Sequence, residues 1–124
     1  MMPNSEKFAR FVLFTIYIWF GLLKIWGTSP ANPLVEALLS RTLPFVSFPT
    51  FMLFLGTFEV IIGLLFLIPL WTRATKIIFA IHMAVVFLPL IFLPAIAWQG
   101  TFVPTLEGQY ILKNLALIAL VAGL

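Results

Sequence analysis

The sequence contains no cysteine, a single histidine and few charged side chains. The absence of cysteine excludes disulfides, thiolate catalysis, CxxC redox chemistry and cysteine-ligated iron–sulfur or zinc sites. A single histidine excludes a metal or haem site built from several histidines of this chain, so we expect no metal site and no intrinsic cofactor. The sequence also lacks a nucleotide-binding glycine loop, an HExxH motif and a nucleophile elbow, which argues against a self-contained enzyme.

What the sequence does contain is apolar. Of 124 residues, 63% are hydrophobic, 9% are charged, and the mean hydropathy is +1.17. A soluble domain of this length could not bury so much apolar surface in one core, so the composition predicts an integral membrane protein. The seven basic residues are scattered singly and form no phosphate-binding stripe, so no nucleic-acid partner is expected.

Apolar runs predict the fold class, because a hydrocarbon core about 30 Å thick requires about 20 helical residues. The expected transmembrane helices cover 8–26, 51–70, 74–98 and 110–124. Leucine and valine recur at helical spacing over 33–43, which predicts a short amphipathic helix in the membrane interface. The sequence therefore predicts an all-α membrane protein, a four-helix antiparallel bundle formed by a single domain, 1–124.

Turn residues and charges predict the connections and the orientation. The stretch 99–108 contains two glycines and a proline and is expected to be a loop or a partial cap. Pro89 and Pro94 should kink the helix 74–98, and Thr72 can cap its start. Positive residues near the first helix and in the tight 69–73 turn lie on one side of a four-span protein, so both termini are expected in the cytoplasm.

Glu59 is a carboxylate inside an apolar run, where an ionisable group costs about 2.5 to 3.5 kcal/mol. A rise of about 1.5 Å per residue places Lys24 about 20 Å and Glu59 about 16 Å from the same membrane side, so we expect an ion pair. The pair could serve ligand chemistry or only helix packing. His82 could bond Glu59 or a buried carbonyl, relay a proton, or be an ordinary packing residue.

Other candidate residues surround this polar pair. Gly56 and Gly63 share a helix face with Glu59, and together with Gly21 they are candidates for close helix packing, or for the approach of a flat ligand. Tyr110 and Asn114 lie four residues apart and could add hydrogen-bonding groups at the outer mouth of the bundle. Lys113 could contribute there or be an ordinary interfacial charge.

The order and spacing of these motifs resemble the DoxX-like family of small membrane proteins. The run WFGLLK at 19–24 resembles the first-helix GxxK signature, and EVIIG at 59–63 with PLWTR at 69–73 resembles the ExxxG…TR pattern. The segments AIHM at 80–83 and GQYILKNL at 108–115 resemble the later helices. Lys24, Glu59, Gly63, Arg73 and Lys113 carry over as motif residues, without an assigned catalytic role.

The resemblance implies a four-helix protein of the prokaryotic inner membrane, and some family members belong to quinone-linked oxidoreductase systems. Our leading hypothesis is accordingly an accessory subunit that binds quinone or docks a redox partner, with the polar line formed by Lys24, Glu59 and His82 contacting the quinone. The competing hypothesis is a structural subunit that fills the edge of a larger membrane complex. A standalone transporter is disfavoured, because the sequence shows no inverted repeat.

Overall fold

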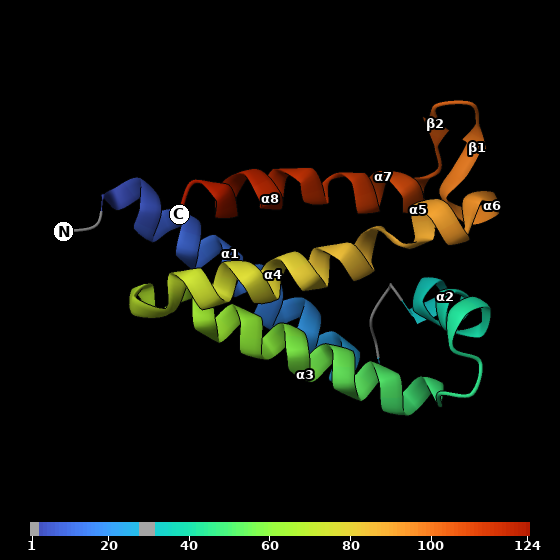
Figure 1. Cartoon of the computed structure of the whole chain (residues 1–124), viewed down its shortest axis with the longest axis horizontal. Helices are drawn as coiled ribbons and strands as arrows, with labels where there is room; N and C mark the ends of the chain where they lie inside the picture. The colour runs from blue at the N-terminus through green and yellow to red at the C-terminus, as the bar shows by residue number, and fades with distance from the viewer. Residues whose placement is uncertain (1–2, 28–31) are drawn as a thin grey trace.

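Two long apolar helices, α1 (Asn4–Ile25) and α3 (Phe48–Phe66), pack against each other along their lengths. Figure 1 shows them side by side in the computed structural model, which describes residues 3–27 and 32–124. Pro49 lies in the first turn of α3, where a missing N–H costs no helical hydrogen bond. Between these helices in the sequence comes α2 (Asn32–Thr42), close to the predicted amphipathic helix 33–43.

Prolines divide the predicted helix 74–98. After the 3₁₀ turn η1 (Pro69–Trp71), α4 covers Thr72–Phe87, α5 covers Pro89–Phe92 and α6 covers Pro94–Ala97. Both α5 and α6 begin at a proline, because proline cannot donate to the preceding turn but is well suited to a first helical position. The expected effect of Pro89 and Pro94 is confirmed, whereas the expectation of one helix as far as Trp98 was wrong.

A short β-hairpin occupies most of the stretch 99–108, where a loop or cap was predicted. Strand β1 (Trp98–Gly100) pairs antiparallel with β2 (Val103–Pro104), and Trp98 lies opposite Pro104. At the tip, Phe102 has a φ of 59°, the left-handed conformation that a tight two-residue hairpin turn favours. The hairpin was missed because its strands are too short to show the period-two alternation that identifies a strand.

The last apolar segment forms α7 (Leu106–Leu112) and α8 (Asn114–Ala122), separated at Lys113. It begins earlier than the predicted range 110–124, because Thr105 caps α7 by accepting a hydrogen bond from the Gly108 N–H at 3.1 Å. In Figure 1, α7 and α8 follow one another alongside α4, and the end of α8 lies at the same end of the molecule as the start of α1. The hairpin and α2 lie at the opposite end.

Within the described part of the chain, three helical segments are long and apolar enough to cross a membrane. They are Asn4–Ile25, Phe48–Phe66 and Pro69–Phe92. Their outward surfaces carry large apolar side chains such as Trp19, Phe54 and Ile81, each more than half exposed. Such surfaces are suited to lipid, which supports the prediction of a membrane protein.

One apolar core joins α1, α3, α4 and α8. Its buried residues are Leu13, Tyr17, Ile62, Phe66, Phe79, Met83 and Val121. The rings of Tyr17, Phe66 and Phe79 contact one another, with centroids 5.8 to 6.1 Å apart. This aromatic cluster holds α1, α3 and α4 in register next to the buried polar residues described below.

Candidate functional site

Glycines set the distance between α1 and α3 and thereby position the charged residues. A Cβ atom built on Gly21 would lie 2.7 Å from the carbonyl oxygen of Gly56, so the two backbones are in direct contact. A Cβ atom on Gly63 would lie 3.1 Å from the Cβ of Tyr17. Lys24 and Glu59 each follow one of the first two glycines by three residues, which brings both side chains next to this helix contact.

Lys24 and Glu59 form the predicted ion pair. The Lys24 ammonium lies 3.0 Å from Oε2 of Glu59 and donates a hydrogen bond to Oε1 at 3.1 Å. The two residues are only 7% and 4% exposed. Because each charge compensates the other, both can remain ionised in an apolar environment.

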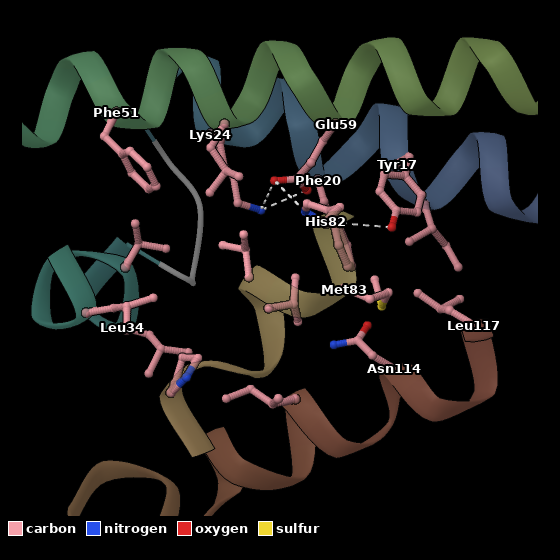
Figure 2. A pocket seen from close by; sticks show the side chains of 18 residues that line it. Tyr17, Phe20, Lys24, Leu34, Phe51, Glu59, His82, Met83, Asn114 and Leu117 are labelled. Atoms are coloured by element: carbon pink, nitrogen blue, oxygen red, sulfur yellow. Dashed lines mark hydrogen bonds and ion pairs between the residues drawn. The ribbon is translucent and has the colours of Figure 1, made fainter. Parts of the chain in front are cut away.

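His82 extends this pair to α4, as Figure 2 shows. Its Nε2 lies 3.8 Å from Oε2 of Glu59, which is too long for a direct hydrogen bond, while Nδ1 lies 2.9 Å from the hydroxyl of Tyr17. An ionised carboxylate can only accept hydrogen bonds. The favoured neutral tautomer of His82 therefore carries its proton on Nε2, the nitrogen that faces Glu59. Nδ1 then accepts the hydrogen bond that Tyr17 donates.

Tyr17 is the member of this cluster that sequence analysis missed. It is 3% exposed and lies in edge contact with the His82 ring, with centroids 5.3 Å apart. A signal was available in the sequence, because Tyr17 precedes Lys24 by seven residues and two helical turns place both on one face. A tyrosine in an apolar segment nevertheless has many alternative locations, and only its contact with His82 distinguishes it.

The cluster lies in the wall of an apolar cavity with a volume of about 100 Å³. The cavity is lined by Ile16, Tyr17, Phe20, Lys24, Leu34, Val35, Leu38, Phe51, Leu55, Glu59, His82, Met83, Val85, Val86, Pro89, Ile111, Asn114 and Leu117. In Figure 2, Lys24, Glu59 and Tyr17 lie on the α1–α3 side, Asn114 and Leu117 lie on the α8 side, and Leu34 and Phe51 lie toward one end. An apolar lining with a few polar groups has the character of a small-molecule site.

One polar atom in this wall has no hydrogen-bond partner. Oε2 of Glu59 is buried and accepts no hydrogen bond from any residue that the structure describes, although the Lys24 ammonium is close to it. The lysine hydrogen bond is directed to Oε1 instead. The Lys24 ammonium lies 3.0 Å from Oε2 and compensates its charge, but a carboxylate oxygen has two lone pairs, so Oε2 keeps capacity for a further hydrogen bond.

The other candidate residues predicted from the sequence lie in different places relative to the cavity. Asn114 lines the cavity, whereas Lys113 is exposed and does not line it. The side chain of Tyr110 lies outside the described residues, so the predicted pairing with Asn114 at the outer mouth stays a prediction. Among the described residues, no three His, Asp or Glu side chains come together as a metal site would require.

A second buried cation, Arg10, lies near the turn between α3 and α4. Its guanidinium donates to the Phe66 carbonyl at 3.0 Å, to the Thr72 hydroxyl at 2.7 Å and to Glu6 at 3.0 Å. Arg10 is one of the positive residues near the first helix on which the predicted orientation rests, yet it is only 5% exposed. Thr72 was expected to cap α4, but its side chain makes no capping bond and instead donates to the Pro69 carbonyl.

Comparison of the chain with protein-family models, with curated proteins and with solved structures gives no significant match. The DoxX-like resemblance therefore remains an interpretation of the motifs. The function has to be inferred from the cavity and from the residues that line it.

Proposed function

We propose that this protein is a small integral membrane subunit that binds a quinone in the cavity and thereby supports quinone-linked redox chemistry. The observation that carries the proposal is the buried polar cluster formed by Lys24, Glu59 and His82 in the wall of an apolar cavity. A quinone has the matching character, with a flat apolar ring, polar oxygens and an apolar tail.

Each residue of the cluster has a distinct part in this proposal. A bound quinone would supply the two-electron, two-proton redox couple, and a partner redox subunit would exchange its electrons. The Lys24 ammonium has three donor hydrogens, and among the described residues it makes one hydrogen bond, to Oε1 of Glu59, so it can also donate toward the cavity. His82 and Glu59 can hold or transfer a proton at the ring oxygen, and Phe20 and Phe51 offer apolar contacts for the ring.

The proposed membrane topology has four spans with both termini in the cytoplasm. The α7–α8 segment supports a fourth span, because α7 contacts α4, while α8 contacts both α1 and α4. Figure 1 shows this segment running the length of α4. Lys113 would interrupt the span near its outer half, where a long lysine stem can extend toward the interface.

A binding titration tests this proposal. We expect the purified protein in lipid nanodiscs to bind a short-chain ubiquinone or its quinol, measured by isothermal titration calorimetry. Glu59→Gln should weaken the binding of at least one form tenfold, while Glu36→Gln should leave it unchanged, because Glu36 is exposed on α2. No binding of either form would overturn the proposal.

A structural role is the second candidate, and the direct glycine contact between α1 and α3 favours it. In this role the Lys24–Glu59 pair specifies which helices meet, and the protein fills the edge of a larger membrane complex. Purification from the native membrane distinguishes the two roles. If Glu59→Gln lowers the yield of a co-purified complex but leaves quinone-dependent activity per complex unchanged, the role is structural.

A further inference from the structure

We propose that the cavity selects the reduced, hydroxyl-bearing form of its ligand, a neutral quinol, over the oxidised quinone. One hydroxyl of the quinol bridges Oε2 of Glu59 and Nε2 of His82. This inference rests on the proposed quinone-binding function and specifies which redox form the site holds.

The first observation is the open acceptor. Oε2 of Glu59 is buried in the cavity wall and accepts no hydrogen bond from the described residues. The Lys24 ammonium lies 3.0 Å from this oxygen but directs its hydrogen bond to Oε1. An ionised carboxylate has no hydrogen to donate, so the remaining lone pairs of Oε2 can be satisfied only by a ligand with a donor. A quinol hydroxyl provides that donor. The carbonyl oxygens of an oxidised quinone only accept, and one placed here would set its lone pairs against those of Oε2.

The second observation is the gap between the two side chains. Nε2 of His82 and Oε2 of Glu59 are 3.8 Å apart, too far for a direct bond. A single oxygen placed to one side of the line between them can lie about 2.8 Å from each atom and bridge them. In the favoured tautomer Nε2 donates and Oε2 accepts, so the bridging atom must accept one hydrogen bond and donate another. A hydroxyl group does both.

Charge restricts the ligand further. The Lys24 ammonium already compensates the Glu59 carboxylate, and His82 is neutral in the tautomer that Tyr17 supports. An anionic ligand would add an uncompensated charge inside an apolar cavity, which is costly. Apart from Asn114, the rest of the lining is apolar, including Leu34 and Val35 of α2. These features favour an uncharged amphiphile with a hydroxyl head.

The experiment compares three probes with the wild-type protein in nanodiscs under anaerobic conditions. The probes are a short-chain ubiquinol, the matching ubiquinone, and the quinol dimethyl ether, which keeps the ring and its oxygens but carries a methyl group in place of each hydroxyl hydrogen. We expect the quinol to bind at least tenfold tighter than the other two, because it alone can donate a hydrogen bond to the carboxylate. Calorimetric titration gives each dissociation constant.

Variants then assign the preference to Glu59. The amide of Glu59→Gln both donates and accepts, so the preference for quinol should fall to less than threefold. If the single variant does not fold, Lys24→Met combined with Glu59→Gln removes both charges together and should lose the preference in the same way. Glu36→Gln, on the exposed surface, should keep it.

The possible failures are distinguishable. If none of the three probes binds, the proposed quinone-binding function is overturned. If the probes bind but the oxidised form or the dimethyl ether binds as tightly as the quinol, the inference about the reduced form is overturned and the binding function stands. A preference for quinol that survives in both Glu59 variants would also overturn the inference, because the donor would then be recognised by another group.

Discussion

Gly21 and Gly56 bring the backbones of α1 and α3 into direct contact, and a Cβ atom on either residue would lie 2.7 Å from the carbonyl oxygen of the other. Neither oxygen can move away without bending its helix. We therefore expect Gly21→Ala to lower the free energy of unfolding by about 1–3 kcal/mol, the usual cost of overpacking. Reversible unfolding in mixed detergent micelles measures this change.

Gly123→Ala is the matched control for the glycine contact. An added Cβ there would lie 3.5 Å from its nearest neighbour, an ordinary contact, and the backbone is helical with a φ of −79°. We expect no loss of stability. An equal loss for Gly21→Ala and Gly123→Ala would contradict a specific α1–α3 contact.

The Lys24–Glu59 pair predicts that substitutions at its two positions have non-additive effects on the free energy of unfolding. Lys24→Met leaves a carboxylate buried without its cation, and Glu59→Gln leaves an uncompensated ammonium, so each single variant should lose about 3–5 kcal/mol. The double variant should be more stable than the sum of the single losses implies, because no charge remains buried. The same unfolding assay measures the cycle, and additive losses would show that the two side chains do not interact.

Tyr17→Phe tests the link between α1 and α4. The change removes the hydroxyl that lies 2.9 Å from Nδ1 of His82 and leaves a buried ring nitrogen without its partner, at a cost of about 1–3 kcal/mol. His82 is the only histidine, so its ring nitrogens give unambiguous NMR signals. We expect the wild-type spectrum to show the neutral tautomer with the proton on Nε2. A spectrum with the proton on Nδ1 would contradict the assigned hydrogen-bond direction.

Arg10→Lys tests the turn between α3 and α4. A lysine ammonium cannot reproduce the fork of donors that contacts the Phe66 carbonyl, Thr72 and Glu6 together. We expect a loss of about 1–3 kcal/mol and faster hydrogen exchange at the first amides of α4. Arg73→Lys, at an exposed position in the same turn, is the control and should be neutral. Equal effects of the two variants would show that the buried contacts of Arg10 do not stabilise the turn.

The proposed topology can be tested by cysteine labelling, because the wild-type chain has no cysteine and each introduced thiol is the only one. With four spans, membrane-impermeant maleimide should label Ser5→Cys, Ala74→Cys and Gly123→Cys from the cytoplasmic side. Thr101→Cys, at the hairpin tip, should react from the other side. Labelling of Gly123→Cys on the same side as Thr101→Cys would show that α7 and α8 do not cross the membrane.

Much of the polar site could be predicted because a membrane helix advances by a constant rise per residue. That regularity placed Lys24 and Glu59 at similar depths, and their ion pair is confirmed. The same regularity does not specify which helix faces a given side chain. The contact of Tyr17 with His82 joins positions 65 apart in sequence and could not be predicted from local pattern.

Local chemistry determined the apolar helices, the interruptions at Pro89 and Pro94, and the presence of ionisable side chains within apolar segments. These features follow from side-chain hydropathy and from the missing N–H of proline. The tertiary structure alone decided that Glu59 would lie in the wall of a cavity with one oxygen that accepts no hydrogen bond from the described residues. The reason is physical: a cavity and an open acceptor depend on how several helices pack around one atom, and packing is a property of the assembled fold.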